Sequence, residues 1–194
     1  MKTLSLLGAV TGIALFSGIR LYATVLTVGV CLRYGLLRLP PELSSLEILS
    51  HPYVLAAAAF CAAVEFLADK IPWVDSLWDS IHAFVRPAGA ALIAFAAVGS
   101  LPPAAEVAIV LLCGGVAFSS HAAKSGARLA VNQSPEPFSN VLVSLVEDAV
   151  AVGGGYAAVA HPFAALAAVA AFLLLFAVLA RRLIRRFRRK SPPA

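Results

Sequence analysis

The segment that decides how the chain is organised reads Ala62-Ala63-Val64-Glu65-Phe66-Leu67-Ala68-Asp69-Lys70. It closes a run, residues 52–64, that contains no charged side chain. A carboxylate at the end of such a run costs about 2.5–3.5 kcal/mol when the run inserts into a membrane. The run therefore predicts a membrane-spanning helix, and Glu65 predicts a charge partner or a function inside the membrane.

The composition is that of a membrane protein. Of the 194 residues, 61% are hydrophobic and 13% are charged, whereas a soluble domain is about 45–50% apolar and about 25% charged. The long apolar runs predict an all-α, polytopic fold with one transmembrane domain over residues 1–180. The arginine-rich segment 181–194 is expected to be a basic cytoplasmic tail that faces anionic lipid headgroups rather than nucleic acid.

Six apolar runs are expected to cross the membrane, at residues 4–31, 51–69, 86–98, 106–123, 141–159 and 163–180. Gly18 and Arg20 predict a helix break or a close helix contact inside the first run. The third run is shorter than the about 17–25 residues that a full crossing takes, so the span either begins earlier, within residues 81–85, or is partly re-entrant.

A short amphipathic helix is expected at the membrane interface over residues 73–82. Its apolar side chains recur at three-to-four spacing and include two tryptophans, which is typical of an interfacial helix. Asp75, Asp79 and His82 fall between the apolar positions. We expect them on a solvated side, with a metal-binding face as the alternative.

The distribution of basic residues predicts the orientation. With both termini in the cytoplasm, Lys2, Lys70, Arg86, Lys124, Arg128 and the basic tail fall on the inner side, and only Arg33 and Arg38 fall outside. Cytoplasmic loops carry the excess of Lys and Arg. The chain is therefore expected to be a multi-pass protein of the bacterial inner membrane with an even number of spans.

The two halves of the chain, at about residues 4–100 and 106–180, share an order of landmarks. Each has a glycine, a Phe-Ser pair and a cation, then Val-Glu at 64–65 or 146–147, then an apolar run led by Pro87 or Pro162. A three-span unit has an odd number of crossings, so its second copy inserts upside down. The pattern predicts a 3+3 inverted repeat with the working site between the halves, near mid-membrane.

The candidate site is a set of acidic residues from both halves. At a rise of about 1.5 Å per residue, Glu65 and Glu147 reach similar depths and are predicted to face each other, supported by Asp69 and Asp148. Facing carboxylates bind a cation or share a proton. The expected counter-charges or gating residues are Arg20, Lys70, Arg86, His121, Lys124 and Arg128.

The same residue types are equally consistent with a salt-bridged scaffold. The identity of any metal ion stays open, no cofactor is expected, and no hydrolase, phosphate-loop or redox motif points to an enzyme.

Several segments together resemble the bacterial integral-membrane family catalogued as domain of unknown function 4126. These are residues 18–23, 65–75 with Asp-Lys-Ile-Pro, 86–89, 121–124, and 134–137 with Ser-Pro-Glu-Pro. The resemblance covers most of the chain and implies no established activity. Locally, Glu65 to Lys70 is also similar to the Glu-x-Gly-Asp-Lys signature of manganese- and calcium-type cation/proton exchangers, although it is one residue longer and lacks the glycine.

Three functions follow as hypotheses. The first is a small-ion transporter or channel, for a cation or with proton coupling, and the resemblance to exchangers favours it. The second is a lipid or headgroup translocase that holds phosphate on Arg20, Lys124 and Arg128. The third is a structural or assembly protein without transport activity. The expected partners are membrane lipids, a small ion and a second copy of the chain, with no nucleic acid.

Overall fold

The computed structural model describes residues 2–99, 101–131 and 137–190, and every regular element in them is helical. The order is α1 (Lys2–Arg33), η1 (Pro41–Ser50), α2 (Pro52–Ala68), α3 (Pro72–Val98), α4 (Pro103–Val131), α5 (Pro137–Ala160) and α6 (Pro162–Lys190). Each element after α1 begins on a proline, because proline has no N–H to leave unbonded and its fixed φ suits the first helical turn. The all-α prediction is confirmed.

Five helices, namely α1, α3, α4, α5 and α6, are long and apolar enough to cross a membrane. The pair η1 and α2 passes the same test together but is bent by 65°, and as a single broken span it would make six. The fold is therefore that of a polytopic membrane protein. The expected count of six corresponds to the case in which this bent pair crosses.

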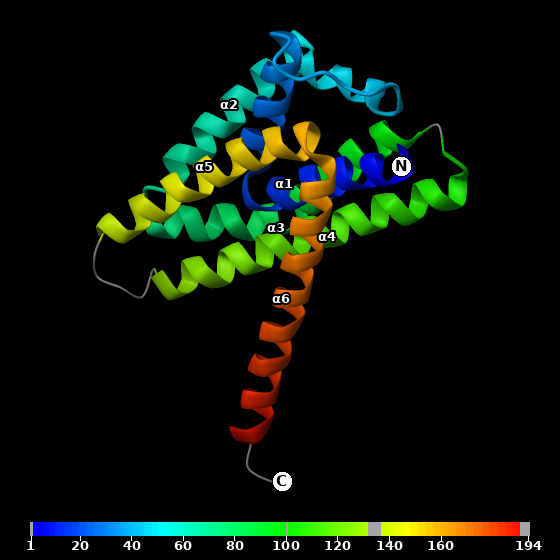
Figure 1. Cartoon of the computed structure of the whole chain (residues 1–194). Coiled ribbons are helices and arrows are strands. Elements are labelled where there is room, and N and C mark those ends of the chain that lie inside the picture. Colours follow the sequence, from blue (N-terminus) through cyan, green and yellow to red (C-terminus); the bar gives the residue numbers. More distant parts are fainter. Residues whose placement is uncertain (1, 100, 132–136, 191–194) are drawn as a thin grey trace.

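Helix α1 lies at the centre of the molecule and packs against α3, α4, α5 and α6 (Figure 1). Its backbone is non-helical at Arg20, where φ is −147° and ψ is 89°, so the two halves of α1 run in different directions. This is the break that Gly18 and Arg20 predicted. Gly18 also makes the close contact, because a Cβ there would collide with Ser120 Oγ and the Ala117 carbonyl of α4.

The C-terminal end of α1 is fixed by Gly35. Its φ of +70° is a conformation that glycine adopts without the Cβ penalty of other residues. The Leu36 N–H donates to the Cys31 carbonyl at 2.8 Å and the Gly35 N–H donates to the Leu32 carbonyl at 3.1 Å. This pattern is a Schellman motif, and it ends α1 at Arg33.

Helix α3 corrects the expectation of a short interfacial helix followed by a short third span. Residues 72–98 form one helix of 27 residues with Pro87 inside it. At about 1.5 Å per residue the helix is about 40 Å long, more than the hydrocarbon core of about 30 Å. Arg86-Pro87 therefore does not open a new helix, and the third helix is long and apolar enough to cross a membrane.

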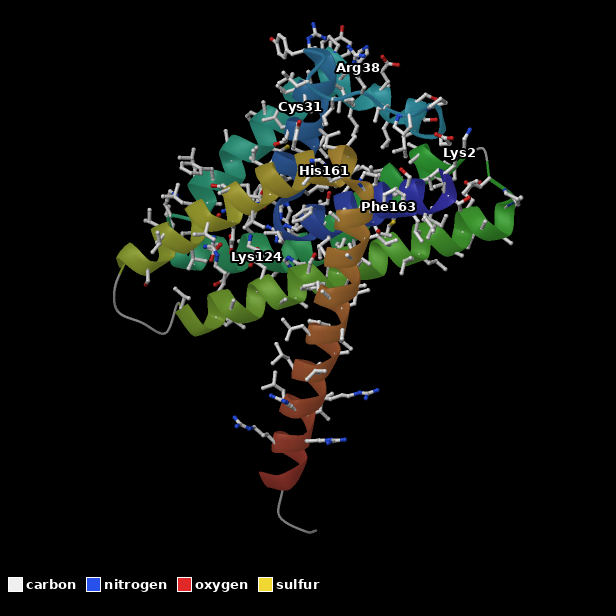
Figure 2. The ribbon with its side chains drawn as sticks, in the orientation of Figure 1. Lys2, Cys31, Arg38, Lys124, His161 and Phe163 are labelled. Atoms are coloured by element: carbon white, nitrogen blue, oxygen red, sulfur yellow. The ribbon has the colours of Figure 1, made fainter. Side chains whose placement is uncertain are left out.

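Helices α3 and α4 lie side by side, and α6 runs steeply across them and projects away from the rest of the chain (Figure 1). The start of α6 packs on α1, where Gly12 leaves room for Ala165 of α6 and Ala158 of α5. Helix α6 continues to Lys190, so the segment expected as a separate tail from residue 181 is helical up to that point. Figure 2 shows Arg38 at the periphery and Lys124 among the helices.

Candidate functional site: a buried charged network

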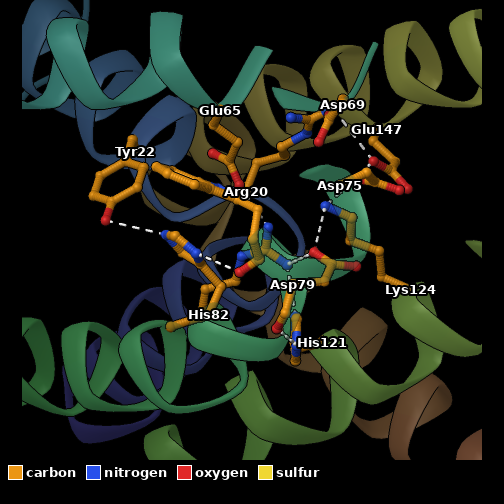
Figure 3. Close-up of polar contacts among 12 residues, drawn as sticks. Arg20, Tyr22, Glu65, Asp69, Asp75, Asp79, His82, His121, Lys124 and Glu147 are labelled. Atoms are coloured by element: carbon orange, nitrogen blue, oxygen red, sulfur yellow. Dashed lines mark hydrogen bonds and ion pairs between the residues drawn. The ribbon is translucent and has the colours of Figure 1, made fainter. Parts of the chain in front are cut away.

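Ten charged side chains form one continuous set of ion pairs inside the molecule, hereafter the charged network. Figure 3 shows part of it, including Arg20, Asp79 and Lys124. They come from five helices and the residue that caps α2, and none of the described side chains of α6 takes part. The cations are Arg20, Arg86, Lys124 and Arg128, and the carboxylates are Glu65, Asp69, Asp75, Asp79, Glu147 and Asp148.

Arg20 joins the carboxylates of two helices at the break in α1. It pairs with Asp69 and, through Nη2 at 3.3 Å, with Glu147. Its Nε lies 3.1 Å from Asp148 Oδ1, and its Nη2 donates to Ser144 Oγ at 2.9 Å. The Ser144 hydroxyl in turn donates to Asp69 at 3.2 Å. The side chain of Arg20 is 1% exposed, so the break carries a fully buried charge.

The end of α2 supplies Glu65 and Asp69, which lie one helical turn apart. Glu65 Oε1 accepts from Arg86 Nη2 at 2.6 Å. Asp69 is the C-cap of α2 and takes Arg20 and, at 3.2 Å, Arg128 as its cations. The segment that ends the uncharged run therefore meets three cations from α1, α3 and α4.

Helix α3 places Asp75, Asp79, His82 and Arg86 on one buried face. Their spacing of four, three and four residues follows the helical period. Asp79 Oδ1 lies 3.3 Å from Arg86 Nη1, and Asp75 Oδ1 lies 3.3 Å from Arg128 Nη1. His82 contacts the Trp78 carbonyl through Nδ1 at 2.8 Å and the Tyr22 hydroxyl through Nε2 at 3.2 Å.

The expected solvated side of this segment is wrong, because Asp75, Asp79 and His82 are 2%, 8% and 3% exposed. The sequence held one signal for their burial. Arg86 continues their helical period, which makes a polar stripe too long for a ten-residue interfacial helix. The metal-binding alternative finds no support either, since the described residues contain no group of three or more His, Cys, Asp or Glu suited to a metal ion.

Helix α4 places His121, Lys124 and Arg128 against the polar face of α3. Arg86 Nη1 donates to His121 Nδ1 at 2.6 Å, which leaves Nε2 to donate to the Asp79 carbonyl at 3.1 Å. Ser125, one turn after His121, donates to Asp79 Oδ2 at 3.0 Å. His121 was expected as a gating residue, and the structure places it between Arg86 and Asp79.

Lys124 and Arg128 connect α3 with α5 in different ways. Lys124 Nζ lies 3.6 Å from Asp79 and 3.5 Å from Glu147, and it makes no hydrogen bond in the described part of the chain. Arg128 instead holds Glu147 by two hydrogen bonds, from Nε at 3.0 Å and from Nη2 at 2.7 Å.

All the sequence-derived site residues except Lys70 belong to the network or bond to it. Lys70 Nζ lies 3.8 Å from the centre of the Phe66 ring. Glu65 and Glu147 are held by different cations: Glu65 by Arg86, and Glu147 by Arg20, Lys124 and Arg128. Asp69 shares two cations with Glu147, Arg20 and Arg128. Asp75, Asp79 and Asp148 share one each.

Two grooves reach the network from outside. The first, hereafter the polar groove, lies between α3 and α4 and has a volume of about 350 Å³. Its polar lining includes Asp75, Asp79, Ser80, His121, Ser125 and Arg128. The second, hereafter the apolar groove, has a volume of about 410 Å³, lies between α4 and α5, and carries Lys124 and Glu147 among alanine, leucine and valine side chains.

The chain was compared with known protein families, curated proteins and solved structures. Neither the curated proteins nor the solved structures provide a match to the chain. The model of a family described as a domain of unknown function, DUF4126, matches residues 7–182. That range contains every residue of the charged network and confirms the resemblance seen in the sequence. The chain belongs to the DUF4126 family.

Proposed function

We propose that this membrane protein is a small-cation transporter or channel with proton coupling, and that the charged network is its working site. The observation that supports the proposal most is the charge balance. Six carboxylates share four cations, so the fully ionised network carries an excess of two negative charges. An uncompensated charge inside a membrane protein is costly, and protons or a bound cation remove that cost.

A purely structural network would be better served by equal numbers of both signs. The cations here are instead shared: Arg86 contacts Glu65 and Asp79, and Arg128 contacts Asp69, Asp75 and Glu147. Each carboxylate therefore has less than one positive charge to itself. This sharing favours a site that takes up and releases positive charge over a closed scaffold.

The break in α1 offers a way to couple charge to movement. Arg20 lies at the only non-helical position inside α1 and touches carboxylates of α2 and α5. Broken helices with exposed backbone polar groups recur at the ion sites of transporters. When Asp69, Glu147 or Asp148 changes its charge, the forces on Arg20 change, and the two halves of α1 reorient about the break.

The orientation in the membrane is part of the proposal. Both termini face the cytoplasm if η1 and α2 together form one broken span, because the count of crossings is then even. The basic end of α6 then lies on the inner side of the bacterial plasma membrane, as the positive-inside rule requires.

The lipid-translocase alternative has one specific observation in its favour. Lys124 lines the apolar groove, is 6% exposed, and its Nζ donates no hydrogen bond within the described residues. An anionic headgroup would satisfy it while acyl chains filled the groove. The negative excess of the network opposes an anionic ligand, so we rank this function second. An anionic lipid retained in native mass spectrometry and lost on Arg20→Ala would reverse the order.

The transport proposal is tested in proteoliposomes with a dye that reports internal pH. An imposed sodium or potassium gradient should drive proton movement in the wild type, and Glu65→Gln should abolish it. Glu47→Gln, the same change at an exposed carboxylate of η1, is the control and should leave flux unchanged.

Because Glu65→Gln leaves Arg86 without its shortest ion pair, folding is checked by gel filtration. Asp148→Asn is a milder variant, since the Asp148 side chain is 28% exposed and pairs with Arg20 alone among the described residues. A wild type that moves neither protons nor cations, or an unchanged flux in folded Glu65→Gln and Asp148→Asn, refutes the proposal.

A further inference from the structure

The polar groove between α3 and α4 leads to the part of the network where carboxylate oxygens lack hydrogen bonds. Asp75 and Asp79 line it, and they are 2% and 8% exposed. Their Oδ1 atoms accept no hydrogen bond within the described residues. A buried carboxylate oxygen without a donor costs about 1–3 kcal/mol or more. These two Oδ1 atoms face Arg128 and Arg86 at 3.3 Å instead.

The cations near the groove leave these two carboxylates undercompensated. Asp75 has Arg128 as its cation at 3.3 Å, and Arg128 also holds Asp69 and Glu147. Asp79 lies 3.3 Å from Arg86, which it shares with Glu65, and 3.6 Å from Lys124. All three distances exceed those of ordinary charge-assisted hydrogen bonds, about 2.7–2.9 Å. The excess negative charge of the network therefore lies partly on Asp75 and Asp79, beside the polar groove.

Further acceptors lie along the same wall. The Ser80 hydroxyl donates to the Ser76 carbonyl, and the Ser125 hydroxyl donates to Asp79. Each hydroxyl has used its one proton and keeps lone pairs to accept with. The groove therefore offers hydroxyl acceptors beside the carboxylates of Asp75 and Asp79, and Arg128 and His121 also line it.

The volume of the polar groove favours a small molecule over a metal ion as its ligand. The groove volume of about 350 Å³ lies at the lower end of the range of about 300–1,000 Å³ for small-molecule sites. A bare metal ion would leave most of it empty, and the described residues provide no group suited to a metal. The exposed Phe118 ring in the lining offers a face for a cationic group.

We propose that the polar groove binds a small organic cation with N–H donors, such as a primary ammonium or a guanidinium, between Asp75 and Asp79. These carboxylates stand one turn apart, with Cβ atoms about 5–6 Å apart, so two N–H groups of one planar guanidinium reach both. The inference rests on the transport proposal, for which it names the substrate class, but the binding site is tested separately.

The test measures binding to the purified full-length protein in detergent, by thermal unfolding and by calorimetry. Guanidinium and methylammonium chloride are the ligands, and tetramethylammonium, which has no N–H, is the control. We expect saturable stabilisation by the first two and none by the third. Equal effects of all three cations, or no saturable binding, would overturn the inference.

Two variants place the site in the groove. Asp79→Asn removes a carboxylate and should weaken guanidinium binding at least tenfold. Because it disturbs the network, Ala122→Leu is the second variant: Ala122 lines the groove, and a leucine there fills space without changing charge. Ala108→Leu, the same change at an exposed position of α4, is its matched control and should bind like the wild type.

Binding and transport then fail separately. Coupled proton and sodium flux without guanidinium binding overturns this inference and leaves the transport proposal standing. Groove-dependent binding without proton movement under a sodium, potassium or guanidinium gradient supports the site and refutes transport. Unaltered binding in folded Ala122→Leu refutes the groove as the location.

Discussion

At the scale of single residues, the arginines hold the site together by geometry as much as by charge. Arg128 reaches Glu147 with Nε and Nη2, Asp69 with the same Nη2, and Asp75 with Nη1. A planar guanidinium presents five donors in a fixed fork, whereas a lysine ammonium is a point charge with three. The three carboxylates around Arg128 therefore need an arginine.

Arg128→Lys should destabilise the folded protein by about 1.5–3 kcal/mol, the range for a lost hydrogen bond to a charged group. Thermal unfolding in detergent measures the change. Arg33→Lys is the control: Arg33 is exposed, its one described hydrogen bond goes to the Ser50 carbonyl at 3.3 Å, and a change within about 0.5 kcal/mol is expected at such surface sites. Equal stabilities of the two variants would contradict the role given to Arg128.

The sequence identified part of this site, because a charged side chain within an apolar run has a high free energy unless it is paired. Glu65, Glu147 and Arg20 stand out because each interrupts an apolar run, and a buried charge demands a partner. Asp75 and Asp79 did not stand out, because acidic residues beside tryptophans are typical of the interface. Only the packing of α3 on α4 shows that Arg86, Lys124 and Arg128 compensate them, and the partner assignment of Glu65 depends on that packing too.

At the scale of elements, the same compensation explains why α3 is longer than its sequence suggested. Arg86 followed by Pro87 looks like the start of a helix, since a charge and a proline both interrupt an apolar run. Arg86 is 0% exposed and its charge is met by Glu65 and Asp79, so the helix continues through it. The break in α1 was predictable from local residues alone.

The close contact between α1 and α4 gives a prediction at this scale. Gly18→Ala should destabilise the protein by about 1–3 kcal/mol, as overpacked sites do, because the new Cβ collides with the Ala117 carbonyl, which cannot rotate away as a side chain would. Gly126→Ala on α4 is the matched control. A Cβ there meets open space, and replacing a helical glycine by alanine stabilises by about 0.5–1 kcal/mol. Thermal unfolding should shift in opposite directions, and a shift of the same sign would refute the packing of Gly18.

At the scale of the whole molecule, the charged network joins both halves of the chain. Arg20, Glu65, Asp69, Asp75, Asp79 and Arg86 belong to the first half, and Lys124, Arg128, Glu147 and Asp148 to the second. A site between the halves was the expectation drawn from the repeat. The inverted repeat itself stays a prediction: α5 packs closely on α1, and α2 has no comparable contact with α4.

The number of membrane crossings depends on whether the bent pair η1–α2 spans the membrane. If the pair crosses, both termini lie on one side of the membrane; if it turns back, they lie on opposite sides. We expect the first, because it puts the basic end of α6 and Lys2 together in the cytoplasm. Single cysteines at Leu4 and Arg185, both exposed, in a variant without Cys31, Cys61 and Cys113 distinguish the cases. In intact spheroplasts neither should react with a membrane-impermeant maleimide, and both should react after permeabilisation. Labelling of one position from outside would mean five crossings, with the two termini on opposite sides of the membrane.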